Sequence, residues 1–132
     1  MEKQHQHPFF SLAVNMVQQA GLLARQVQEE VRPQSLAKHD RSPVAVADFA
    51  VQALVGCLLE RAVPRATLVA EEDSRLLRQP EAADILRHVA HFLGKFLAYV
   101  TPESVFAWID KGKGDPSDSF WVLDPIDGTK GF

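Results

Sequence analysis

The sequence predicts an α/β domain in which long amphipathic helices pack on short strands. Residues 8–31 and 42–62 carry apolar side chains at the three- and four-residue steps of a helix. Residues 67–70 and 120–123 are short apolar runs that end in acidic residues, which is typical of buried strands with polar tips. At 132 residues, the chain is long enough for one domain with a modest core.

The first helix is expected from Pro8 to Val31. It should end before Pro33, because a residue that precedes a proline disfavours the helical conformation. Its predicted apolar stripe consists of Phe9, Ala13, Met16, Val17, Ala20, Ala24, Val27 and Val31. The preceding residues 1–7 are polar, so we expect them to form a frayed tail.

The second helix has two alternative starts. Ser42 and Pro43 fit an N-cap with a proline in the first turn, and a start near residues 46–48 fits equally well. In both cases Asp48 lies in or near the first turn, where a carboxylate interacts favourably with the helix dipole. The predicted buried positions are Ala47, Ala50, Val51, Leu54, Val55, Leu58 and Ala62.

Two further segments have helical spacing. Residues 80–100 carry one apolar stripe, formed by Ile85, Val89, Phe92, Leu93, Phe96 and Val100. Thr101 and Pro102 provide an N-cap and a first-turn proline for a short helix, with a strand over residues 105–109 as the alternative. Residues 113–119 are rich in Gly, Pro, Ser and Asp and are expected to form a loop.

Composition and charge restrict the class of protein. The chain is 46% hydrophobic and 23% charged, as in ordinary globular domains, and its net charge of −3 argues against nucleic-acid binding. No uninterrupted apolar run reaches the roughly 18 residues of a membrane span. The single cysteine, Cys57, cannot form an internal disulfide, and the N-terminus resembles no targeting signal. We therefore expect a cytoplasmic monomer that binds neither nucleic acid nor membrane.

The acidic residues at the two strand ends carry the candidate chemistry. Residues 71–73 are three consecutive acids, and Asp124 and Asp127 flank a turn. Carboxylate oxygens suit Mg²⁺, and two such ions stabilise both the attacking and the leaving oxygen in phosphoryl transfer. Gly128 lets the backbone approach a phosphate closely, and the hydroxyl of Thr129 can orient a water molecule. Two alternatives exist for residues 71–73, a solvated surface turn and a metal site. Taken alone, these residues fit the solvated turn better.

Three blocks together resemble a known superfamily: residues 38–48, 69–73 and 121–132. They are similar to the lithium-sensitive, magnesium-dependent phosphatases that include inositol monophosphatase and fructose-1,6-bisphosphatase. Within that superfamily they most resemble the 3′(2′),5′-bisphosphate nucleotidases, which convert adenosine 3′,5′-bisphosphate, a by-product of sulfation, to AMP. Residues 42–44 and 130–132 favour this branch, because inositol monophosphatases typically carry Thr-Asn-Phe at the latter position.

The resemblance implies a role for each matched residue. The implied Mg²⁺ ligands are the carboxylates of Glu71, Asp124 and Asp127 and the backbone carbonyl of Ile126. The implied catalytic pair that polarises the attacking water is Asp40 and Thr129. The implied binding site for the substrate phosphate is Asp127 with the backbone amides of Gly128 and Thr129. Asp48 and Glu72 would support these groups without binding the metal directly.

The resemblance also implies a layered αβαβα sandwich, to which residues 8–132 would contribute long amphipathic helices on a largely antiparallel sheet. Because it covers only the amino-terminal part of a complete family member, we expect an amino-terminal piece that is inactive alone. Ala45 stands where family members usually have Thr, which removes one local hydroxyl. Two alternatives stay open: an inositol phosphate as substrate, and a truncated protein without catalytic function.

Overall fold

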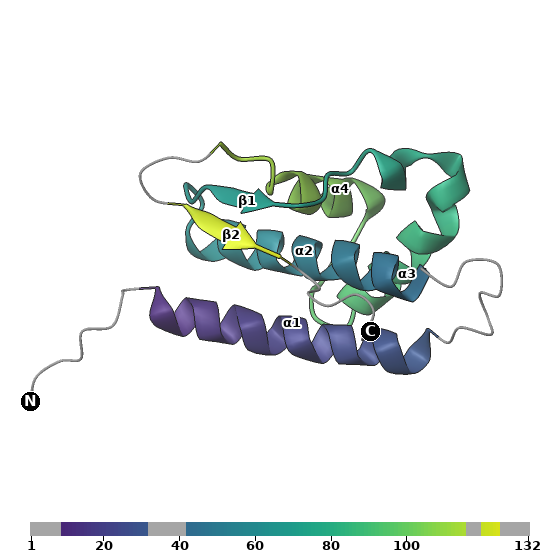
Figure 1. Cartoon of the computed structure of the whole chain (residues 1–132), viewed down its shortest axis with the longest axis horizontal. Helices are drawn as coiled ribbons and strands as arrows, with labels where there is room; N and C mark the ends of the chain where they lie inside the picture. The colour runs from purple at the N-terminus through teal and green to yellow at the C-terminus, as the bar shows by residue number, and fades with distance from the viewer. Residues whose placement is uncertain (1–8, 32–41, 116–119, 125–132) are drawn as a thin grey trace, which may run out of the picture.

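The computed structural model describes residues 9–31, 42–115 and 120–124, and this part of the chain is mainly helical (Figure 1). The elements in chain order are α1 (Phe10–Glu30), α2 (Ser42–Ala62), β1 (Leu68–Ala70), the 3-10 helices η2 (Leu76–Arg78) and η3 (Pro80–Ala82), α3 (Ala83–Leu93), α4 (Pro102–Asp110) and β2 (Trp121–Leu123). The predicted tail, residues 1–7, lies outside the described residues.

Helix α2 is the centre of the domain and packs against α1, α3 and α4. In Figure 1 it lies between α1 and the layer that contains β1 and α4. Its buried apolar residues surround the helix instead of forming one stripe: Val46, Ala47, Phe49, Ala50, Val51, Ala53, Leu54, Val55, Cys57 and Leu59. The earlier of the two alternative starts is confirmed, because the helix begins at Ser42. Ala62, predicted to be buried, is exposed at the helix end.

Within the described ranges, one helical segment is long and apolar enough to cross a membrane. This segment is Pro43–Ala62, which forms nearly all of α2. However, 72% of the apolar window is buried inside the protein. A core helix passes the same test of length and composition, and this degree of burial fits a core helix. Asp48 interrupts the apolar run of this helix, so the sequence contains no uninterrupted apolar stretch long enough for a membrane span.

Helix α1 ends at Glu30, before Pro33 as predicted, but its buried face is rotated from the predicted stripe. Met16 and Val27 are buried as expected, and Leu23, which was not predicted, is fully buried. Val17 is 71% exposed, so its assignment to the core is wrong. It lines an apolar groove of about 170 Å³ between α1 and β2.

Helix α3 is shorter than the amphipathic pattern of residues 80–100 predicted. The chain enters it through two 3-10 turns, and regular helix covers only Ala83–Leu93. Tyr99 then adopts a left-handed backbone conformation with φ of 58°. For α4 the helix is confirmed and the strand alternative is wrong. Thr101 and Ser104 form a reciprocal capping box at its first turn.

The sheet differs from the prediction. Strands β1 and β2 are parallel, with Leu68 opposite Trp121 and Ala70 opposite Leu123. The expected largely antiparallel sheet is therefore wrong for the described residues, where the one antiparallel contact is an isolated bridge between Val69 and Lys113. The long connection through α3 and α4 allows this parallel pairing, since parallel strands need a crossover and cannot be joined by a tight turn.

Candidate active site

The parallel pairing brings the two acidic strand ends to one edge of the sheet. Ala70 and Leu123 are partners in the register, so Glu71 and Asp124 are the next residues on each strand. Because parallel strands run in the same direction, both residues leave the sheet at the same end. Both are exposed. Two of the predicted metal ligands, far apart in the sequence, are thus placed at the same edge.

Helix α2 adds a third carboxylate to this edge. Asp48 is half-buried, and burial is the main reason that its pKa rises from 3.8 to about 6. The negative charges of Glu72, Glu71 and Asp124 raise it further, in that order. Asp48 is therefore close enough to the strand ends for their charges to act on it. Burial and the neighbouring carboxylates together keep Asp48 protonated to a higher pH than an exposed aspartate.

The three consecutive acids after β1 have different environments. Asp73 forms a bidentate pair with Arg75 (Nε–Oδ1 3.1 Å and Nη2–Oδ2 3.0 Å), and this hydrogen bonding lowers the pKa of Asp73. Glu72 is half-buried, and its pKa is raised first by burial and then by Glu71 and Asp73. Asp73 is therefore neutralised locally, whereas Glu71 and Glu72 have acidic neighbours. We name Glu71 and Glu72 together the acidic tip.

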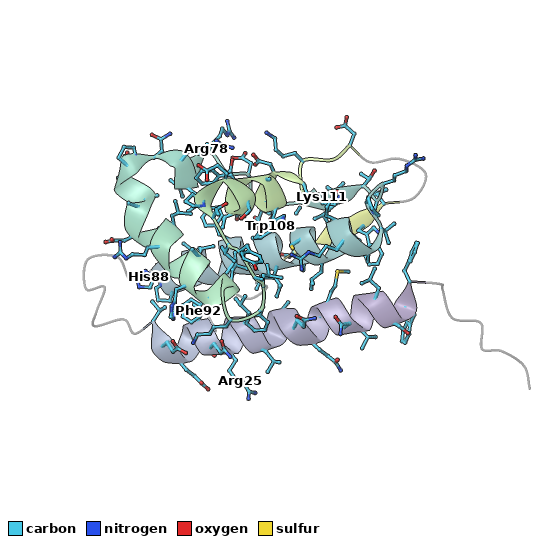
Figure 2. All side chains as sticks on the ribbon, turned by 180° about the vertical axis from the view of Figure 1, so that it is seen from behind. Arg25, Arg78, His88, Phe92, Trp108 and Lys111 are labelled. Atoms are coloured by element: carbon cyan, nitrogen blue, oxygen red, sulfur yellow. The ribbon has the colours of Figure 1, made fainter. Side chains whose placement is uncertain are left out.

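A network from α4 holds the chain that follows the acidic tip. Asp110 accepts hydrogen bonds from the Ser74 amide (2.8 Å) and hydroxyl (2.7 Å). Arg78 donates from Nε to the Ser74 hydroxyl (2.8 Å). Its guanidinium lies 4.4 Å from the centre of the Phe106 ring, beside α4 (Figure 2). The loop after β1 is thus tied to the end of α4.

Sequence reasoning missed three residues that hydrogen-bond in or next to the acidic tip: Gln52, which bonds to the backbone of Glu72, and Asp110, which bonds to Ser74. One signal was present for Gln52, a polar residue inside the apolar stretch 49–59, since a buried amide needs hydrogen-bond partners. Ser74 and Asp110 carry no such signal, because each looks like an ordinary polar residue near the end of an element.

An open depression of about 520 Å³ lies next to the acidic tip. Its walls are formed by side chains from α2 and from the chain after β1: Phe49, Glu71, Glu72, Asp73, Arg75, Leu76 and Gln79. The depression combines carboxylates with one guanidinium and two apolar side chains. It is large enough for a small polar ligand.

The other predicted site residues lie outside the described ranges: Asp40, Ile126, Asp127, Gly128 and Thr129. Within the described ranges, no three His, Cys, Asp or Glu side chains converge closely enough to hold a metal ion. The donors that are present nevertheless fit Mg²⁺ chemically, because they are hard carboxylate oxygens. Burial is the main cause of the raised pKa of Asp48, and a divalent cation would offset the smaller part that comes from the neighbouring carboxylates.

Comparison with known proteins identifies the family. The family model described as "Inositol monophosphatase family" matches residues 5–132. The chain belongs to the inositol monophosphatase family. Residues 38–48, 69–73 and 121–132, on which the resemblance was based, lie inside the matched region, as do nearly all the other residues of the chain.

Several relatives that are similar to this chain over most of its length are 3′(2′),5′-bisphosphate nucleotidases. The one from Oryza sativa is 40% identical over 126 residues, which cover 86% of this chain and 35% of the relative. The one from Emericella nidulans is 38% identical over 130 residues, covering 88% and 36%. One from Arabidopsis thaliana is 38% identical over 136 residues, covering 92% and 36%. The chain thus spans little more than a third of the length of these relatives.

Proposed function

We propose that residues 1–132 form part of a Mg²⁺-dependent phosphomonoesterase that hydrolyses the 3′-phosphate of adenosine 3′,5′-bisphosphate to give AMP. The observation that carries this proposal is the parallel pairing of Ala70 with Leu123, which sets Glu71 and Asp124 at one edge beside Asp48. The names of the relatives support the nucleotide as substrate.

The proposed residues have separate roles in the hydrolysis: some bind the metal, some orient the water and some bind the phosphate. Glu71, Asp124, Asp127 and the Ile126 carbonyl would hold Mg²⁺. When bound, the metal lowers the pKa of water and neutralises charge on the phosphate. In this proposal the carboxylate of Asp40 would accept a hydrogen bond from the Thr129 hydroxyl and so orient it toward the attacking water. The backbone amides of Gly128 and Thr129 would donate to the phosphate oxygens and hold the phosphate for in-line attack.

The charge of the site explains why a cation is part of this proposal. Glu71, Glu72, Asp48 and Asp124 are all acidic, and the other three raise the pKa of Asp48 in addition to its burial. Such an edge repels a doubly phosphorylated nucleotide unless positive charge is added. In the described residues near the acidic tip, Arg75 is already paired with Asp73.

The test is phosphate release by the protein encoded by the complete reading frame that contains residues 1–132. Adenosine 3′,5′-bisphosphate and inositol 1-phosphate are offered separately, with MgCl₂ or with EDTA. We expect release from the nucleotide, dependence on Mg²⁺, and inhibition by lithium. Release from the inositol phosphate alone would refute the proposed substrate, and full activity in EDTA would refute the proposed cofactor.

The chain of 132 residues is tested in parallel as a separate sample. We propose that it releases little or no phosphate, because it spans only 35% of the length of the Oryza sativa relative. Rapid, lithium-inhibited hydrolysis by this chain would contradict that proposal without affecting the assignment of the substrate.

A further inference from the structure

Gln52 is a polar residue in the fully buried middle of α2, with no exposed surface. We propose that Gln52 is a positioning residue that holds the acidic tip (Glu71 and Glu72) at the edge of the sheet. The inference rests on the proposed function in one respect: that function is the reason why the acidic tip must stay at the edge of the sheet. The hydrogen bonds that carry the inference are independent of it.

The Gln52 carboxamide binds both backbone groups of Glu72. Its Oε1 accepts from the Glu72 amide (3.1 Å), and its Nε2 donates to the Glu72 carbonyl (2.7 Å). The second Nε2 hydrogen is used by the carbonyl of Ile109 (2.8 Å) in α4. Pairing with both the amide and the carbonyl of one residue is what a neighbouring strand does in an antiparallel ladder. Gln52 thus pairs both backbone groups of Glu72, two residues beyond the end of β1 at Ala70.

The surrounding backbone is built to admit this side chain. At Gly112 a methyl group would lie 2.7 Å from Gln52 Nε2 and 2.8 Å from the Ala70 side chain, so a larger residue would displace the amide. The carbonyl of Gly112 also accepts a hydrogen bond from the Ala70 amide (2.9 Å). Helix α2, strand β1 and the end of α4 therefore meet at Gln52.

A purely space-filling role does not explain a glutamine at this position. A buried amide is unfavourable unless its donors and acceptor are paired, whereas an apolar residue of similar volume has no such requirement. A fully paired network, in contrast, favours a single arrangement of the groups that it joins. Here that arrangement keeps Glu72, and Glu71 beside it, close to Asp48 and Asp124. Like charges repel, so without this restraint we expect the acidic tip to move away from the edge.

The test replaces Gln52 by methionine, which keeps the volume and removes all three hydrogen bonds. The matched control is Leu59→Ala, in the same helix and also fully buried, which lowers stability without removing a bond to Glu72. Two quantities are measured in the protein encoded by the complete reading frame. They are hydrogen exchange at the Glu72 amide and the affinity for Mn²⁺, which serves as a spectroscopic probe of oxygen-ligand sites.

We expect Gln52→Met to speed exchange at the Glu72 amide relative to the amides of α2, and to weaken Mn²⁺ binding about tenfold or more, as for other residues that orient metal ligands. Leu59→Ala should leave the affinity for Mn²⁺ unchanged. It should speed exchange at the Glu72 amide no more than at the amides of α2. Equal Mn²⁺ affinity in Gln52→Met and Leu59→Ala would overturn the inference, because Gln52 would then contribute stability alone.

Failure of the proposed function has a different signature. If the unmodified protein neither binds Mn²⁺ nor releases phosphate, the proposed function fails, and exchange at the Glu72 amide then decides the inference. Unchanged exchange in Gln52→Met overturns it. Should Gln52→Met not fold, Gln52→Asn replaces it in both measurements. Asparagine keeps the carboxamide but is one methylene shorter, so it cannot reach all three partners, and the same outcomes apply.

Discussion

Ala70 of β1 and Leu123 of β2 are paired in a parallel register, so the residues that follow them leave the sheet at the same edge. This single pairing brings Glu71 next to Asp124 across more than fifty residues of intervening helix and loop. An antiparallel pairing would have placed these two residues at opposite ends of the sheet. The acidic edge is therefore a consequence of strand direction. The contacts that hold the surrounding helices and loops in place can be tested separately.

Asp110→Ala is expected to destabilise the protein by about 2 kcal/mol, because it leaves the buried Ser74 amide and hydroxyl without their acceptor. The free energy of unfolding in urea measures the effect. The control is Asp84→Ala, which removes a surface pair with Arg87 and should cost less than about 1 kcal/mol. Equal losses in the two variants would show that the network does not hold the loop after β1.

Gly56→Ala is expected to destabilise by roughly 1–3 kcal/mol, because the added methyl would overlap the carbonyl oxygen of Trp108 where α2 and α4 cross. Gly21→Ala is the matched control in α1, since a methyl there meets nothing within 4 Å. It should stabilise the helix by about 0.5–1 kcal/mol. Thermal unfolding of both variants measures the difference, and a stabilising Gly56→Ala would disprove the close approach.

Thr101→Ala should lower the free energy of unfolding by about 1 kcal/mol, because α4 loses the side-chain acceptor for its Ser104 amide (3.1 Å). Thr101→Ser keeps the hydroxyl and is expected to retain most of the stability. Urea unfolding of the two variants separates the cap from other effects of the substitution. A loss of the same size in Thr101→Ser would point to the methyl group of Thr101 instead.

Asp48 predicts a dependence of stability on pH. Its pKa rises from 3.8 to about 6 in the folded protein, so the folded state binds the proton more tightly than the unfolded chain does. The resulting stability is fully present below pH 3.8 and is lost as the pH rises through 6. Asp48→Asn removes the charge and should stabilise the protein at pH 8 by roughly 1–2 kcal/mol, allowing for solvent screening.

The measurement for Asp48→Asn is urea unfolding at pH 4 and pH 8 in the presence of EDTA. The gain over the unmodified protein should be clearly larger at pH 8. The same gain at both pH values would mean that the ionised carboxylate is not disfavoured in the folded state.

Asp127→Asn is expected to reduce phosphate release severely in the protein encoded by the complete reading frame. The amide is a neutral and weaker ligand than the carboxylate, so the Mg²⁺ proposed to bind there would be held poorly. Phosphate release from adenosine 3′,5′-bisphosphate measures the effect, with Asp84→Asn on the surface of α3 as control. Near-normal activity of Asp127→Asn would exclude Asp127 from the site.

Local patterns in the sequence predicted the elements whose structure depends on near neighbours. The helical spacing, the proline at residue 33 and the cap at Thr101 correctly indicated α1, α2 and α4, and the motif blocks indicated the family. The roles of Asp40, Asp127 and Thr129 stay predictions, since these residues lie outside the described ranges. Capping and periodicity act over a few residues, which is why they can be read without the fold.

Contacts between distant segments settled what those patterns left open. The direction of the sheet depends on a crossover of fifty residues, and the two described strands are parallel where an antiparallel sheet was expected. The rotation that buries Leu23 and exposes Val17 depends on which side of α1 meets α2. The partners of Gln52 lie in the segment after β1 and in α4, so its place beneath the acidic tip appears only when these segments are packed together. Such pairings join residues far apart in the chain, and no local spacing encodes them.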